Sequence, residues 1–219
     1  MYGMREKLSW FGHQGSKRLS TAMIEGSNEV VGTQAKAQTL NLASLSVLVI
    51  DDNDYSMSLM TSVLKALEVG RILTARSVVE GINLLQLSAA LAEDGRHPEI
   101  DIVIAEMVTS SGYGVEVLQW LRTNQREKMR FLPFIMMSGY ADRKHVERSR
   151  DHGANEFLSK PFSVNSIALR LISVIDRPRP FVKSPTYFGP DRRRRDVSYL
   201  GQERRLNNRK NVEIIRERD

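Results

Sequence analysis

The chain has 219 residues, of which 41% are hydrophobic, and its formal net charge is +6. This length suits one domain with extensions, and the absence of cysteine excludes disulfides, thiol nucleophiles and Cys-based zinc sites. No apolar run approaches the roughly 18 residues that a membrane-spanning helix needs. The N-terminus also lacks the apolar core of a signal peptide. We therefore expect a cytoplasmic protein without a transmembrane segment.

The positive charge is concentrated near the C-terminus. Residues 1–176 carry 19 Lys and Arg against 20 Asp and Glu, whereas residues 177–219 carry 13 against 6. Charge and composition together predict three parts. These are a flexible N-terminal extension over 1–44, a folded domain over 45–177 and a basic, Pro- and Arg-rich tail over 178–219.

Short apolar runs alternate with amphipathic stretches in the folded part. The runs VLVI, RILTA, IDIVIA, LPFIMM and NEFL have the composition of buried strands. We expect these strands at 47–50, 71–75, 100–105, 132–137 and 155–158. A stretch with helical spacing of its apolar residues follows four of them, and a polar helix over DRKHVERSRDHG is predicted after LPFIMM. Five such βα units predict a doubly wound α/β fold around a parallel sheet.

Polar side chains follow four of the five strands, where ligands bind in sheets of this kind. They are Asp51 and Asp52, Glu106, Ser138 and Lys160. Paired carboxylates supply the hard oxygen ligands that Mg²⁺ prefers. A metal ion and an ammonium group together neutralise phosphoryl oxygens. The set therefore favours phosphoryl chemistry on magnesium.

Over about residues 46–177 the chain resembles the receiver domain of two-component response regulators. The motifs that carry the resemblance are VLVIDDND, DIVIAEM, GVEVLQWLR, PFIMMSGY and NEFLSKPF. It implies a flavodoxin-like (βα)5 fold and a non-enzymatic role in phosphorelay signalling. The roles it implies are a magnesium-binding pair at Asp51 and Asp52 with Glu106 as a further ligand, a switch hydroxyl at Ser138, a phosphate-contacting lysine at Lys160, a switch aromatic at Phe157 and a state-reporting Tyr140.

Glu106 stands where the resemblance places the phospho-accepting aspartate. Its extra methylene moves the carboxylate outward by roughly one C–C bond, whereas in-line attack tolerates about half an ångström. Three interpretations stay open: a permanent negative charge that imitates the activated state, a silent scaffold, and true phosphorylation. We expect an atypical, phosphorylation-independent receiver that acts by protein–protein contact, through its fourth and fifth strands and helices. Its partner would be a histidine kinase, a phosphotransfer protein or a downstream effector.

The tail supports a second hypothesis, in which it binds nucleic acid, an acidic partner or an anionic surface. The arginines that would do so are Arg192, Arg193, Arg194, Arg195, Arg204 and Arg205. Pro and Gly are expected to prevent regular structure until about residue 201, with a short helix over about 206–215.

A third hypothesis is an enzyme. The run DNDYS at 52–56 resembles the DxDx(T/V) opening of haloacid-dehalogenase-like phosphatases. The acidic pair that this family has after a later strand does not follow Lys160. Asp54, the second acid of that motif, is also well placed to cap the first helix of the folded part.

Overall fold

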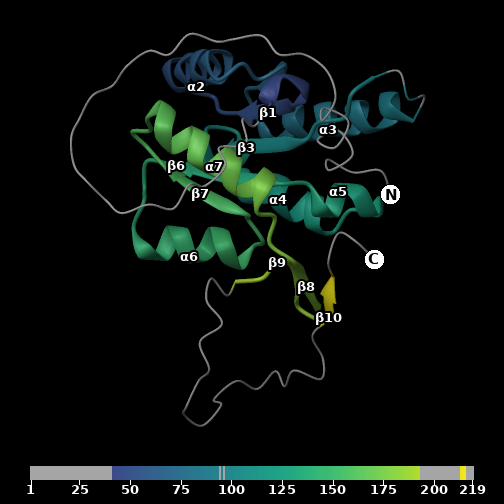
Figure 1. Cartoon of the computed structure of the whole chain (residues 1–219). Helices are drawn as coiled ribbons and strands as arrows, with labels where there is room; N and C mark the ends of the chain where they lie inside the picture. Colours follow the sequence, from purple (N-terminus) through teal and green to yellow (C-terminus); the bar gives the residue numbers. More distant parts are fainter. Residues whose placement is uncertain (1–40, 94, 96, 193–212, 216–219) are drawn as a thin grey trace, which may run out of the picture. The chain divides into compact units, whose positions relative to one another are not determined.

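The computed structural model describes residues 41–93, 95, 97–192 and 213–215, and its main feature is a five-stranded parallel sheet in the order β2-β1-β3-β6-β7 (Figure 1). The strands are β1 (Ser46–Ile50), β2 (Arg71–Ala75), β3 (Ile102–Glu106), β6 (Phe134–Ser138) and β7 (Glu156–Ser159). The chain runs from β1 outward to β2 and returns to β3 on the other side. The strand order therefore reverses between β1 and β3, and the flavodoxin-like α/β fold is confirmed.

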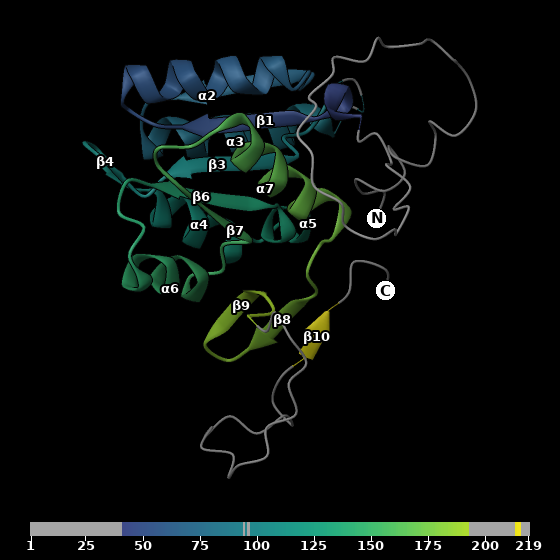
Figure 2. The same ribbon diagram turned by 60° about the vertical axis from the view of Figure 1, so that its left-hand side comes forward.

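Helices cover both faces of this sheet. Figure 2 shows α7 in front of the sheet and α3 and α4 behind it. The long helices are α2 (Asp54–Ala66), α3 (Val78–Ala92), α4 (Gly114–Arg122), α6 (Arg143–Asp151) and α7 (Val164–Asp176), all five of them expected from the sequence. The short elements η2 (Leu42–Ser44), β4 (Val108–Thr109), β5 (Gly112–Tyr113) and α5 (Glu127–Phe131) were not expected.

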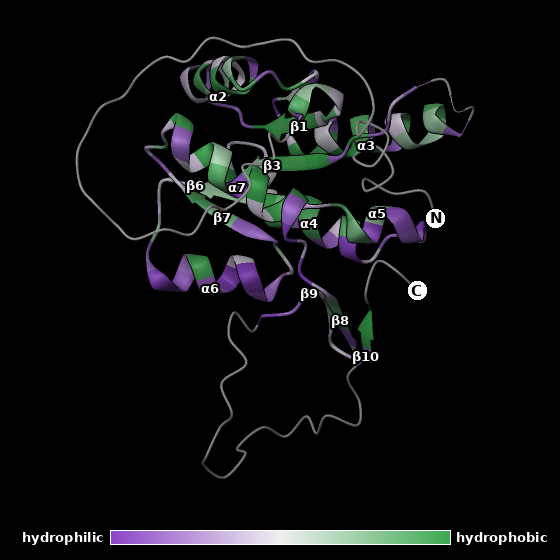
Figure 3. Cartoon of the chain, in the orientation of Figure 1, coloured by the Kyte–Doolittle hydropathy of each residue, from purple (hydrophilic) through white to green (hydrophobic). Residues whose placement is uncertain are grey.

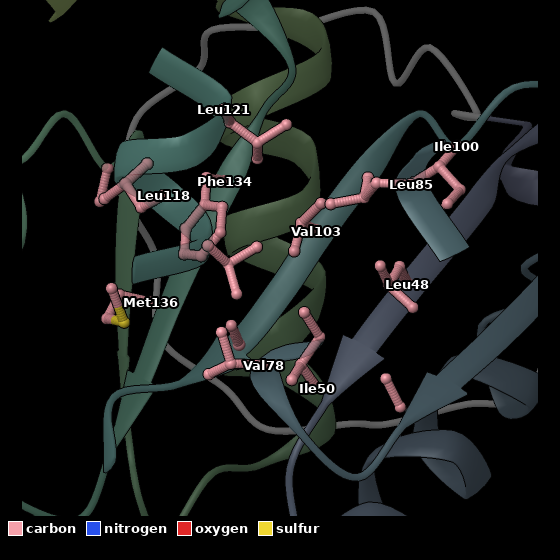
Figure 4. Packing of buried hydrophobic residues seen from close by; sticks show 14 of the residues in the cluster. Leu48, Ile50, Val78, Leu85, Ile100, Val103, Leu118, Leu121, Phe134 and Met136 are labelled. Atoms are coloured by element: carbon pink, nitrogen blue, oxygen red, sulfur yellow. The ribbon is translucent and has the colours of Figure 1, made fainter. Parts of the chain in front are cut away.

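The core explains why the strands read as continuous apolar runs. Successive residues of a strand point to opposite faces, and here helices bury both. Leu48 and Ile50 of β1, Val103 of β3 and Phe134 and Met136 of β6 belong to one buried cluster, which also takes in residues of α3 and α4 (Figure 4). The intervening residues of the same strands are equally buried.

Polarity distinguishes α6 from the central strands. In Figure 3, β1 and β3 are green and α6 is mostly purple. Ser149 is the buried residue of α6, so this helix lies on the sheet with nearly all its side chains toward solvent. None of the helices in the described part of the chain is long and apolar enough to cross a membrane.

The described part of the tail differs from the expectation. Phe181–Ser184 (β8) and Tyr187–Pro190 (β9) form an antiparallel hairpin, and Glu213–Ile215 (β10) pairs with the other edge of β8. The prediction of no regular structure before residue 201 is therefore wrong, and 213–215 is a strand and not part of a helix. Proline is tolerated at strand ends and on edge strands, and Pro190 ends β9. The extension up to residue 40 and residues 193–212 lie outside the described residues.

Candidate functional site

Asp51 is positioned by the end of β1 and is almost fully buried. Its Oδ1 accepts a hydrogen bond from the Asn53 amide at 2.9 Å. Its Oδ2 accepts one from the Ser56 hydroxyl at 2.6 Å and one from Lys160 Nζ at 2.8 Å. A buried carboxylate needs such partners to offset its lost hydration. Both oxygens of Asp51 therefore already have donors from the chain itself.

The start of α2 corrects one expectation. Asn53, and not Asp54, caps this helix, since Asn53 Oδ1 accepts from the Ser56 amide at 2.9 Å. Asp54 instead pairs with Arg76 at 2.5 Å on the surface, and this hydrogen bond lowers the pKa of the Asp54 carboxyl. Asp54 is thus paired with Arg76 and does not contact Lys160. This arrangement does not support the phosphatase hypothesis.

Glu106 is the last residue of β3 and is 7% exposed. Its Oε1 accepts a hydrogen bond from the Met107 amide at 3.1 Å, and its Oε2 forms an ion pair with Lys160 Nζ. Burial raises the pKa of the Glu106 carboxyl, and the nearby Asp51 charge adds to this, while Lys160 opposes it.

Lys160 connects the two buried acids. It follows β7 directly, and its backbone amide donates to the Ser138 carbonyl at 2.8 Å, which fixes the residue beside β6. Burial alone would lower the pKa of the Lys160 ammonium, but its hydrogen bonds with Asp51 and Glu106 outweigh that effect and raise it. The cation therefore lies between two carboxylates, one from β1 and one from β3.

Asp52 has a different role from its neighbour. Its Oδ2 accepts a hydrogen bond from the Ser110 amide at 2.6 Å, and hydrogen bonding with Ser110 lowers the pKa of the Asp52 carboxyl. Ser110 lies in the small loop after Glu106, where β4 pairs with β5 and Thr109 Oγ1 donates to the Gly112 carbonyl at 2.8 Å. Asp52 thus holds this loop. No sequence pattern marks Ser110, and only its place four residues after Glu106 indicates a role.

The predicted switch residues lie on the β6 and β7 side of the site. Ser138 ends β6 fully buried, and its hydroxyl accepts from the Tyr140 amide at 3.0 Å. The Tyr140 side chain is 68% exposed and stacks on His145 with ring centroids 5.6 Å apart. Phe157 is half-buried and packs against the core cluster. Their roles as switches stay predictions.

The predicted magnesium ligands are engaged with other groups of the chain. Within the described ranges, no three His, Cys, Asp or Glu side chains are grouped so that they could hold a metal ion. Asp51 and Glu106 are paired with Lys160, and Asp52 is bonded to Ser110. The ammonium of Lys160 supplies the positive charge that a divalent cation would bring. As placed, these residues do not fit a resident Mg²⁺.

Arg192 is the one predicted tail residue that the structure describes. Its guanidinium lies 3.1 Å from Asp151 Oδ1 and 4.1 Å from the centre of the Tyr187 ring. It therefore contacts the end of α6. Arg193, Arg194, Arg195, Arg204 and Arg205 lie outside the described residues, and their role stays a prediction.

Comparisons with known proteins agree with the geometry. Residues 47–172 match the family model of the response regulator receiver domain. The chain is 29% identical over 119 residues to the polar-differentiation response regulator DivK of Brucella ovis, covering 54% of this chain and 86% of that protein. A response regulator in red light signaling of R. palustris has a similar fold, with a TM-score of 0.50, 24% identity, and coverage of 61% and 95%. The receiver domain of a histidine kinase from Syntrophus aciditrophicus also gives 0.50, at 17% identity, with coverage of 71% and 98%.

Proposed function

This chain belongs to the response regulator receiver family of two-component signalling, and we propose that its acceptor site is occupied by an internal ion pair in place of a phosphoryl group. It would then act as a phosphorylation-independent receiver, through contact with another signalling protein. The observation that carries this proposal is the contact of Glu106 Oε2 with Lys160 Nζ, because the resemblance gives position 106 to the acceptor aspartate.

The ion pair leaves neither a free Lys160 ammonium nor a free Glu106 carboxylate for phosphotransfer. Lys160 is the residue that the resemblance assigns to a phosphoryl oxygen, yet here it already has Asp51 and Glu106 as partners. The Glu106 carboxylate is turned toward this ammonium, and a nucleophile held in another contact loses the alignment that in-line attack requires. The carboxylates also do not group around a common point for Mg²⁺. Phosphotransfer to Glu106 is therefore disfavoured.

Among the phosphorylation-independent interpretations, the contacts favour a scaffold over imitation of the activated state. A permanent charge shifts a conformational equilibrium only if it makes different contacts in the two states. The Ser138 hydroxyl is bonded to the Tyr140 amide, and Glu106 is bonded to Met107 and Lys160. The single negative charge of Glu106 is paired with Lys160. A phosphoryl group would carry nearly twice that charge and more oxygens, so Glu106 imitates it poorly.

The contact face of the proposed scaffold is the surface of α6, β7 and α7 next to the site. Tyr140 and Val146 are exposed there, and α6 is otherwise strongly polar. Exposed aromatic residues in a polar surround are typical of protein-binding surfaces. We assign this surface to a signalling partner, which would be a histidine kinase, a phosphotransfer protein or a downstream effector.

The test is the intact mass of the protein after incubation with Mg²⁺ and acetyl phosphate. Wild type and Glu106→Asp are compared, with Glu106→Gln as the control that has no carboxylate at this position. We expect no phosphoryl adduct on wild type or on Glu106→Gln. An adduct on Glu106→Asp alone would mean that the surrounding pocket is competent and that glutamate has closed it. An adduct on wild type, mapped to Glu106 or Asp52, would overturn the proposal.

A further inference from the structure

The β8–β9 hairpin packs against α5 through three aromatic rings. Phe131 of α5 lies with its ring centroid 4.8 Å from that of Phe181 and 5.3 Å from that of Phe188. The two hairpin rings are 5.5 Å apart, so all three are in mutual contact. Such pairs stabilise an interface beyond the area that they bury. Figures 1 and 2 draw this hairpin with β10 as a small sheet of its own beside the main one.

A buried arginine lies beneath these rings. Arg122, at the end of α4, is 4% exposed, and its guanidinium lies 5.1 Å from the centre of the Phe181 ring. It donates to the Gly153 carbonyl at 3.0 Å and to Asn155 Oδ1 at 2.9 Å. Asn155 Oδ1 also accepts from the Phe134 amide at 3.0 Å, so the starts of β6 and β7 are joined. The hairpin thus covers a hydrogen-bonded centre that reaches both strands.

The hairpin also contacts the turn between α6 and β7 through backbone atoms. A Cβ added at Gly189 would come within 2.8 Å of the Gly153 Cα, which shows how closely the two backbones approach. Arg179, just before the hairpin, donates to the Asn155 carbonyl and lies 3.6 Å from Glu156. The Arg192 and Asp151 pair adds a contact at the end of α6. Contacts from residues 179–192 therefore reach both ends and the middle of 151–156.

This turn is one short strand away from Lys160. β7 has four residues and pairs with β6 from Glu156 to Ser159, and a strand rises about 3.3 Å per residue. The same strand is therefore fixed at its start by the hairpin and at its end by the Lys160 amide on Ser138. A β-strand keeps a nearly constant rise per residue, so a displacement of Asn155 along β7 would move Lys160 as well.

We propose that the β8–β9 hairpin is a built-in regulatory element that positions Lys160 through β7. Docking of the hairpin stabilises the ion pair of Lys160 with Glu106, and release of the hairpin frees the turn after α6 and loosens that pair. A ligand or partner that pulls the hairpin away would act on the acceptor site from the opposite end of the sheet. This inference rests on the ion-paired site described under the proposed function, but not on its signalling role.

Hydrogen exchange of the full chain, read by mass spectrometry, tests the coupling in both directions. Phe188→Ala weakens hairpin docking, and Glu106→Gln loosens Lys160 while keeping the shape of the side chain. Tyr55→Ala is the matched control, because it removes an aromatic ring that is 78% exposed on α2. Coupling between sites is reciprocal and is typically about fivefold or more. We expect each of the first two variants to raise exchange by at least about that factor at the other site, at 156–162 or at 181–190.

The results separate the regulatory inference from the proposed function. Faster exchange of 181–190 in Phe188→Ala with unchanged 156–162 would overturn the inference and make the hairpin an inert appendage. If Phe188→Ala exchanges faster throughout the chain, Arg192→Met replaces it, since this surface substitution removes only the contacts with Asp151 and Tyr187. A phosphoryl adduct on wild type would overturn the proposed function alone, because the exchange of β7 reports the position of Lys160 and not phosphorylation.

Discussion

Arg122→Met is expected to destabilise the protein, because it removes the centre of the network beneath the hairpin. Arg122 donates to four acceptors: the carbonyls of Gly153, Arg130 and Leu132, and Asn155 Oδ1. None of these partners is a carboxylate, so the guanidinium is held by neutral groups. Methionine has a similar length and fills the space, but it has no donor. The substitution therefore isolates the hydrogen bonds from the packing.

Two opposing terms set the size of the effect. Hydrogen bonds from a charged group contribute about 1.5–3 kcal/mol each, so four of them give on the order of 6–12 kcal/mol. Burial lowers the pKa of Arg122 from 12.5 to about 9, and at roughly 1.4 kcal/mol per pH unit this burial penalty is on the order of 5 kcal/mol. Removing the cation recovers that penalty. The difference is a net loss of about 1–7 kcal/mol.

Urea unfolding of the full chain at neutral pH measures this loss as a lower midpoint at unchanged slope. Arg126→Met is the control, since Arg126 is a half-exposed arginine of the same region with one surface ion pair, and surface substitutions change stability little. Methionine at 122 that leaves the midpoint unchanged or raises it would refute the reasoning. The free-energy penalty of burying the cation would then be as large as the stabilisation from its four hydrogen bonds.

Further predictions concern the acceptor site and the start of α2. Folding raises the pKa of Glu106, so the folded state binds this proton more tightly than the unfolded state does. The protonated carboxyl therefore stabilises the fold at low pH, and this contribution falls as pH rises from about 4.5 through the folded pKa. The urea midpoint of Glu106→Gln should lack this fall, and parallel pH profiles of the two proteins would contradict the prediction. Asn53→Ala should cost about 1 kcal/mol in urea unfolding through the lost cap, whereas Asp54→Ala should change the midpoint little; equal losses would contradict the assignment of the cap. Gly114→Ala should cost about 1–3 kcal/mol or more, because its Cβ would collide with the Glu106 carbonyl oxygen, whereas Gly139→Ala meets nothing within 4 Å and should be tolerated; equal melting temperatures for the pair would count against this.

The sheet and its site could be predicted because the signals are local. The strands β1, β3 and β6 come from contiguous apolar runs, and Asp51, Glu106 and Lys160 each stand at the end of a strand. Parallel strands bring their carboxyl ends to one edge, so their convergence follows from the order alone. The structure confirms this convergence. It places Asp52 elsewhere, on Ser110, because the loop after β3 folds back over the site, and no periodicity encodes that path.

The hairpin could not be predicted because long-range contacts stabilise it. Residues 177–190 contain four prolines, which leave two runs of four residues each, 181–184 and 186–189, and this is a weak local signal. What holds the hairpin is Phe131 and Arg122, which lie 50 or more residues earlier in the chain. The sequence did not predict α5 for the same reason, because a five-residue helix has little intrinsic stability without the rings that pack on it.

The charges around Lys160 favour its position between Asp51 and Glu106. Two buried carboxylates without Lys160 would repel each other in surroundings of low polarity, and desolvation already raises the pKa of Glu106. Lys160 can relieve both only by staying between them. An aspartate at 106 would be shorter and would leave the ammonium nearer to Asp51, with room for a further anion. Glutamate fills that room with its own carboxylate, so an incoming phosphoryl group would have to break the contact of Glu106 with Lys160 before it could form its own.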